Sequence, residues 1–138
     1  MFYCEIISGL WVGDVNILMN QKFIEDNDIG IILNCTSTFQ SIQLNGVQNK
    51  RLPFTDSFDS EKDIALLKKN KKNICDFIKG NLIKQNILIC CFDGKTVSPL
   101  ICALYLYQYS KIDKKSIYPI LLTKDKTFKL WMELSLFD

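Results

Sequence analysis

Between Cys91 and Ser98, a thiol, a carboxylate, an ammonium group and two hydroxyl groups follow one another closely along the chain. Residues 87–89, just before them, are aliphatic and predict a buried strand. Gly94 permits a tight loop, Ser98 is a favourable helix N-cap, and Pro99 suits a first helical turn. A strand, a short loop and a helix N-terminus point backbone N–H groups into one concavity. The segment therefore predicts an anion site, with the thiolate of Cys91 favoured at its mouth.

This segment resembles the phosphate loop of the protein tyrosine phosphatase superfamily, dual-specificity branch, whose signature is His-Cys-x-x-Gly-x-x-Arg-Ser/Thr. Cys91 falls on the nucleophile, Gly94 on the glycine, and Ser98 on the hydroxyl residue after the arginine. Two positions depart from the signature, because Cys90 stands in place of the histidine and Val97 in place of the arginine. The resemblance implies a phosphate-binding role for the loop residues Phe92, Asp93, Gly94, Lys95, Thr96, Val97 and Ser98.

Residues 9–14 and 34–36 resemble further phrases of the same family, so the likeness spans almost the whole chain. It implies that Asp56, four residues after Leu52, is the general acid that protonates the leaving oxygen. It also implies that the hydroxyl of Ser98 eases departure of the thiolate. Taken alone, an aspartate in such a loop is usually a turn or cap residue, and capping would also account for Ser98.

The phosphate clamp of the family is missing. An arginine offers a planar, permanently charged fork to two phosphoryl oxygens, whereas Val97 offers none. Loss of one oxyanion donor lowers a rate on the order of 10²–10³-fold, and arginine fingers in phosphoryl transfer contribute on the order of 10³–10⁵. Because Cys90 replaces the signature histidine, the nucleophile also loses a second polar neighbour. Asp93 adds a negative charge that disfavours the thiolate and repels phosphate.

Lys95 is the one counterweight in the loop. It lies four residues after Cys91, where the phosphoinositide-phosphatase branch also carries a lysine. Lys95 would attract an anion as a point charge and not as a fork, and a solvated loop lysine explains it equally well. Arg51 would overturn the inference of an inert loop if its guanidinium reached the pocket of Cys91.

Three functions remain open. The first is a pseudophosphatase that has lost hydrolysis, wholly or nearly, and binds a phosphorylated or acidic protein or pairs with itself as a homodimer. The second is an active, atypical cysteine phosphatase that uses Cys91 and Asp56, with Lys95 in partial place of the arginine. Its substrate would be a phosphoprotein, a phosphoinositide or an RNA 5′ phosphate. The third is a structural protein whose loop binds nothing.

The composition bounds these functions. At 138 residues and 48% hydrophobic, the chain predicts one globular domain over residues 1–138. A net charge of +2 is too small to imply a nucleic-acid partner. The absence of histidine excludes a Ser-His-Asp triad and any histidine-ligated metal, so we expect neither a metal nor a cofactor.

The six cysteines lie inside apolar runs and not in loops, and no signal peptide precedes them. They therefore predict reduced thiols and a cytoplasmic protein. The wealth of isoleucine, lysine and asparagine is typical of an AT-rich genome, such as that of a virus or a protist, and a viral protein would act in the host cytoplasm. The longest apolar run, residues 100–107, is too short for a membrane span.

Strand and helix patterns alternate along the chain. They predict an α/β fold, with a central, mostly parallel sheet flanked by helices, which is also the cysteine-phosphatase fold that the resemblance implies. The predicted strands cover residues 5–12, 31–33, 49–54 and 87–89. The predicted helices cover residues 15–27, 61–79 with Gly80 as the stop, 99–110, 114–124 and 127–137. In such sheets ligands bind beyond the carboxyl ends of the strands, where the Cys91 loop would lie.

Overall fold

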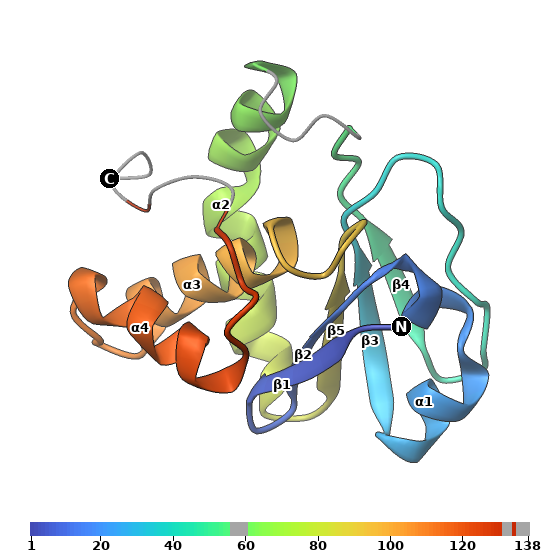
Figure 1. The fold of residues 1–138 in the computed structure, drawn as a ribbon. Coiled ribbons are helices and arrows are strands. Elements are labelled where there is room, and N and C mark those ends of the chain that lie inside the picture. Colours follow the sequence, from blue (N-terminus) through green and yellow to red (C-terminus); the bar gives the residue numbers. More distant parts are fainter. Residues whose placement is uncertain (56–60, 131–133, 135–138) are drawn as a thin grey trace.

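Short strands and helices alternate to form a sheet with helices on both faces (Figure 1). The computed structural model describes residues 1–55, 61–130 and 134. The strands are β1 (Tyr3–Ile7), β2 (Leu10–Gly13), β3 (Ile29–Asn34), β4 (Gln48–Arg51) and β5 (Asn86–Cys90). The helices are the 3-10 helix η1 (Val15–Met19), α1 (Gln21–Asp26), α2 (Glu61–Leu82), α3 (Val97–Tyr109) and α4 (Lys114–Lys124). Among the described residues, no helix is both long and apolar enough to cross a membrane.

The sheet has the strand order β1-β2-β5-β3-β4. Only the β1–β2 pair is antiparallel, and the pairs from β2 to β4 are all parallel. This arrangement confirms the predicted α/β fold with a mostly parallel sheet. In the register of the sheet, Asn34 is the partner of both Cys90 and Arg51. The carboxyl ends of β5, β3 and β4 therefore meet in one row at the same edge.

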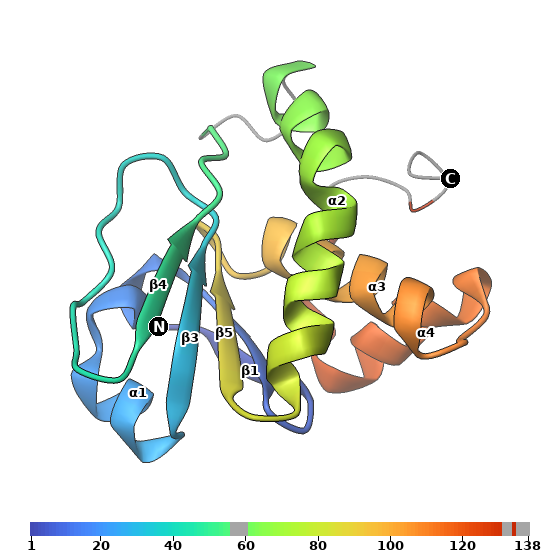
Figure 2. The same cartoon turned by 180° about the vertical axis from the view of Figure 1, so that it is seen from behind.

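Two apolar layers cover the sheet. Helices α2, α3 and α4 lie on one face, and η1 and α1 lie on the other (Figures 1 and 2). Side chains alternate between these layers along β5, where Ile87 and Ile89 belong to the first and Leu88 and Cys90 to the second. Because both faces are buried, the central strands have continuous aliphatic runs, as expected for parallel strands.

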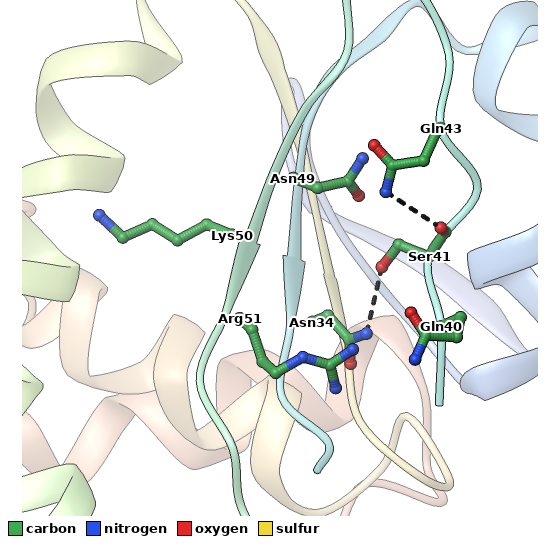
Figure 3. A pocket seen from close by; sticks show the side chains of 7 residues that line it. All are labelled: Asn34, Gln40, Ser41, Gln43, Asn49, Lys50 and Arg51. Atoms are coloured by element: carbon green, nitrogen blue, oxygen red, sulfur yellow. Dashed lines mark hydrogen bonds between the residues drawn. The ribbon is translucent and has the colours of Figure 1, made fainter. Parts of the chain in front are cut away.

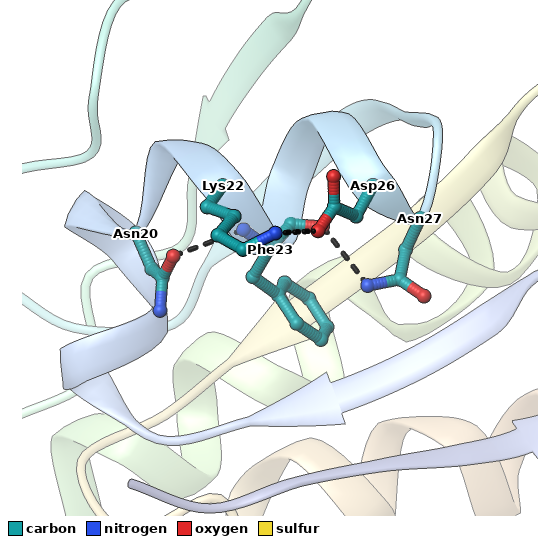
Figure 4. Close-up of polar contacts among 5 residues, drawn as sticks. All are labelled: Asn20, Lys22, Phe23, Asp26 and Asn27. Carbon is teal, nitrogen blue, oxygen red and sulfur yellow. Dashed lines mark hydrogen bonds and ion pairs between the residues drawn. The ribbon is translucent and has the colours of Figure 1, made fainter.

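The single helix predicted over residues 15–27 is wrong in one respect, because the chain divides at Asn20 into η1 and α1. The side-chain oxygen of Asn20 accepts the N–H of Phe23 over 2.9 Å and so caps the new helix (Figure 4). At the other end, the side-chain amide of Asn27 donates to the carbonyl of Phe23. Lys22 and Asp26 form an exposed ion pair along α1. An asparagine at a helix start competes with a continuous helix in this way.

Two further helix boundaries differ from the sequence prediction. Gly80 does not stop α2, which continues to Leu82, because a glycine inside a helix costs only about 1 kcal/mol. Residues 127–130 are not helical, so the predicted helix over 127–137 is wrong there; residues 131–133 and 135–138 lie outside the described part. The carboxylate of Asp125 accepts the Thr127 N–H over 2.7 Å, and this side-chain turn replaces a helical start.

Candidate functional site

Cys91 follows β5 directly, and the loop that it opens leads into α3 at the carboxyl edge of the sheet. The predicted strand, loop and helix are therefore present. Cys91 is completely buried, and its backbone N–H donates to the carbonyl of Gly13 over 3.2 Å. The loop also contacts the segment that follows α4, since the carbonyl of Lys95 accepts the N–H of Lys129. The thiol is thus held at a fixed place between neighbouring segments.

The carboxylate of Asp93 turns inward and takes the hydrogen bonds of the loop. Its Oδ1 accepts the backbone N–H of Lys95 and the hydroxyl of Thr96, each over 2.9 Å. The Cys91 thiol also donates to this oxygen, with 3.5 Å between Sγ and Oδ1. A carboxylate of the chain itself therefore occupies donors that the sequence assigned to a bound anion.

Ser98 is near Cys91, as predicted, but it is not the N-cap of α3. The helix begins at Val97 with Thr96 as its cap residue, and Thr96 makes no side-chain cap because its hydroxyl serves Asp93. The Ser98 N–H donates to Cys91 Sγ over 3.4 Å. Its hydroxyl is completely buried and has no hydrogen-bond partner among the described residues.

The two positions that depart from the signature are both apolar in their surroundings. Val97 is completely buried in the layer formed with α2, α3 and α4, so nothing at this position offers a charge to the loop. Cys90 faces the opposite side of the sheet and packs with Leu88 and Ile32. Burial raises the pKa of the Cys90 thiol well above its ordinary value, and the charges of Cys91 and Asp14 raise it further.

Lys95 points to the aromatic ring of Phe2 and not to an anion in the loop. Its Nζ lies 4.8 Å from the ring centre, a cation–π contact. The Lys95 charge also reaches Asp125, whose pKa is lowered chiefly by the hydrogen bond from Thr127, with smaller help from Lys95. Lys95, which the sequence offered as a partial replacement for the arginine, therefore contacts Phe2 at the side of the loop.

Gly94 and Phe92 complete the loop. Gly94 has a positive φ of 71°, and an added Cβ would lie 2.7 Å from the backbone of Gly13 and 2.8 Å from that of Asp14. Only glycine fits this position. Phe92 is 51% exposed, and its ring lies 6.0 Å from the ring of Phe39, which is 37% exposed. An exposed aromatic pair therefore borders the Cys91 loop.

Arg51, the sole arginine of the chain, does not reach Cys91. Its Nη1 donates to the carbonyl of Thr36 over 2.8 Å, and its Nη2 donates to the carbonyl of Phe39 over 2.9 Å. The guanidinium lies in a polar cavity beside the ends of β3 and β4 (Figure 3). The sequence suggested Arg51 only as a possible phosphate ligand in the pocket of Cys91. It did not predict this cavity, because the partners of Arg51 are backbone carbonyls.

Asp56, the predicted general acid, lies outside the described residues. Its neighbour Thr55 is held in place, because its N–H donates to the buried carboxylate of Asp63 over 2.8 Å. All six cysteines are free thiols. Within residues 1–55, 61–130 and 134, no group of three or more acidic or cysteine side chains could hold a metal ion.

No family model matches the sequence, and a search of curated proteins finds no match. The fold, in contrast, matches solved phosphatase structures over nearly the whole chain. Human DUSP28 is 13% identical with a TM-score of 0.79, covering 93% of this chain and 84% of its own. A leucine-rich repeat and phosphatase domain protein from Entamoeba histolytica is 19% identical with a TM-score of 0.76, covering 98% and 89%.

A human tyrosine phosphatase-like serine/threonine/tyrosine-interacting protein is 13% identical, with a TM-score of 0.78 and coverage of 98% of this chain and 90% of its own. The chain therefore has the dual-specificity phosphatase fold. Cys91 and the N-terminus of α3 lie at the carboxyl edge of the sheet. The resemblance in sequence implies a phosphate loop at this edge.

Proposed function

We propose that this chain is a pseudophosphatase: a domain with the dual-specificity phosphatase fold that hydrolyses phosphate esters very weakly or not at all. It acts instead as a module that binds a phosphorylated or acidic protein. In this proposal the residues at the family's catalytic positions, Cys91, Asp56 and Ser98, are vestigial.

The observation that supports the proposal most is that the Cys91 loop holds the negative charge of Asp93 and lacks an arginine. The arginine position holds the buried Val97, and two loop donors, the Lys95 N–H and the Thr96 hydroxyl, are taken by the carboxylate of Asp93. A phosphoryl group that entered would meet a negative charge instead of a guanidinium fork, and would have to displace the carboxylate. The other nearby cations are bound elsewhere, Lys95 over Phe2 and Arg51 on the carbonyls of Thr36 and Phe39.

The comparison with the human phosphatase-like protein agrees with this proposal. That protein is named as phosphatase-like and as an interacting protein, and the two chains share their fold along nearly their whole lengths. A fold that positions a rigid loop and a helix N-terminus can serve recognition after the chemistry is lost.

The test is turnover of a generic aryl phosphate and of a phosphopeptide by the purified chain. We expect a rate on the order of 10³-fold or more below that of an active phosphatase of this fold, as loss of the arginine dictates. The matched control is Cys91→Ser, which should leave this background unchanged. Turnover that is clearly above background and vanishes in Cys91→Ser would refute the proposal.

One observation favours an active, atypical cysteine phosphatase as the second candidate. The Ser98 N–H donates to Cys91 Sγ, and the buried Ser98 hydroxyl has no partner among the described residues, so it is free to turn toward a leaving thiolate. This candidate predicts a phosphocysteine that can be trapped with substrate by mass spectrometry. It also predicts a strong loss of turnover in Asp56→Asn, whereas the pseudophosphatase predicts neither.

A further inference from the structure

We propose that the cavity beside Arg51 is an oxyanion site, separate from the Cys91 loop, for a carboxylate or phosphoryl group of a polypeptide partner. The inference rests on the proposed function only in assigning the oxyanion to the partner of a binding module. The site itself follows from the juxtaposition of the only guanidinium of the chain with a cluster of side-chain amides.

Only polar and charged residues line the cavity, which is large enough for a small anion. Its volume is about 170 Å³, well above the roughly 10–15 Å³ that one water molecule needs on the same measure. It is lined by Asn34, Gln40, Ser41, Gln43, Asn49, Lys50 and Arg51. Figure 3 shows the guanidinium and the amides on one side of β4, whereas the Lys50 side chain points away from them, with its Nζ 4.5 Å from the Phe77 ring centre.

The charge of Arg51 is not neutralised within the described chain. Each terminal nitrogen donates one hydrogen bond to a neutral carbonyl, that of Thr36 or that of Phe39. A guanidinium has five N–H groups, so three remain for a ligand or for solvent. No ion pair of Arg51 occurs in residues 1–55, 61–130 and 134. A planar fork held by two carbonyls is already oriented, which favours bidentate binding of a carboxylate or phosphoryl group.

Side-chain amides hold the wall of the cavity. Asn34, only 2% exposed, donates to the carbonyl of Phe39 and to the hydroxyl of Ser41, and its oxygen accepts the N–H of Thr36. The side-chain amide of Asn49 donates to the carbonyl of Ile42 over 3.1 Å. These bonds fix the loop after β3 against β4, so the cavity exists before a ligand binds.

Asn49 also carries an unused acceptor. Its Oδ1 is buried and has no donor among the described residues, although a buried carbonyl oxygen normally has one. Because this oxygen is buried, a ligand N–H reaches it only after the Asn49 amide turns toward the cavity.

The position of the cavity suits a partner that also covers the Cys91 loop. Cys90, Asn34 and Arg51 stand opposite one another on adjacent strands, so the Cα atoms of Cys90 and Arg51 are about 10 Å apart at the usual strand spacing. The exposed rings of Phe39 and Phe92 contact each other and come from the two loops concerned. One extended segment can place an oxyanion at Arg51 and an apolar side chain on this pair.

The test uses the side-chain Nε–Hε resonance of Arg51, which is unambiguous because the chain has one arginine. Inorganic phosphate and acetate are titrated separately into the ¹⁵N-labelled protein, with chloride at matched ionic strength as the reference. We expect a saturable shift of this resonance and of the side-chain amides of Gln43 and Asn49. The anion that saturates at the lower concentration identifies the phosphoryl or the carboxylate source.

Two variants separate a built site from general attraction. Arg51→Lys keeps the charge but removes the fork, and should weaken binding at the Gln43 and Asn49 resonances about tenfold. Lys84→Gln removes an exposed charge elsewhere and should leave binding unchanged. If Arg51→Lys fails to fold, the titration of the unmodified protein still decides.

The inference is overturned if neither anion gives a saturable shift at Arg51, if Lys84→Gln weakens binding as much as Arg51→Lys, or if phosphate shifts only the amides of Gly94 and Lys95. Failure of the proposed function looks different, because it appears as turnover that depends on Cys91, whatever binds at Arg51.

Discussion

The Cys91 loop and the Arg51 cavity lie at the same edge of the sheet, but the first holds a carboxylate and the second holds a guanidinium. In the first, the backbone N–H of Lys95 and the hydroxyl of Thr96 bind the carboxylate of Asp93. In the second, backbone carbonyls bind a guanidinium that faces a polar cavity. The donors of the Cys91 loop therefore bind the carboxylate of Asp93. The guanidinium that could bind a ligand belongs to Arg51, about two strand spacings away.

This comparison distinguishes the backbone geometry of the phosphatase fold from the charges that phosphate hydrolysis requires. The backbone that positions Cys91 and Ser98 is kept, since both are buried and the Ser98 N–H still donates to the thiol. The charges that would hold a phosphoryl group at the thiol are not kept. This difference is the basis for proposing a domain that binds an oxyanion and does not cleave its ester.

The largest effect is expected from the rigidity of the Cys91 loop. Gly94→Ala should lower the free energy of unfolding by about 3 kcal/mol, because the new Cβ would clash with the backbone of Gly13 and Asp14 at a positive φ. Gly46→Ala, in the turn before β4, meets nothing within 4 Å and should lower it by only about 1 kcal/mol, from backbone strain alone.

Urea unfolding of the two alanine variants measures this contrast. Equal losses of stability in both variants would mean that the Cys91 loop is no more tightly held than an open turn.

A smaller effect is expected from each buried thiol of the core. Burial is the main cause that raises the pKa of Cys75 to about 12, with a further rise from Asp76 and an opposing effect of Lys71. Burial likewise raises the pKa of Cys35 well above its ordinary value, and the nearby thiols add to this. These thiols stay protonated in the folded chain at a pH where the unfolded chain loses their protons.

Their contribution to stability is therefore complete below about pH 8.5 and is lost as the pH rises toward the folded pKa. One such thiol should lower the free energy of unfolding by about 1.4 kcal/mol per pH unit above that point. Urea unfolding at pH 8 and pH 10 measures the slope, which should be shallower in Cys75→Ala. The same slope in the variant and the unmodified chain would contradict the assignment to Cys75.

The sequence predicted the parts that depend on local pattern. The aliphatic run of β5, the turn at Gly94 and the helix after it follow from residue preferences, and they place Cys91 correctly. The cap at Ser98 was wrong, because Asp93 takes the hydroxyl of Thr96 and the helix starts earlier at Val97.

The Arg51 cavity could not be predicted in the same way. The guanidinium binds the carbonyls of Thr36 and Phe39, and every residue has a carbonyl, so no residue type marks the contact. The inward turn of Asp93 was missed for a related reason. The sequence shows a negative charge near Cys91, but only the structure shows that its oxygen reaches the N–H of Lys95. Polar contacts to the backbone depend on tertiary geometry more than on composition.

The most decisive measurement is where tungstate, an oxyanion shaped like phosphate, binds in crystals of the unmodified protein and of Asp93→Ala. We predict that the unmodified loop stays closed to tungstate, with Asp93 still bound to the N–H of Lys95, and that the variant admits tungstate beside Cys91. Tungstate held by the N–H groups of Lys95 and Ser98 in the unmodified protein, with Asp93 turned outward, would contradict a loop occupied by its own carboxylate.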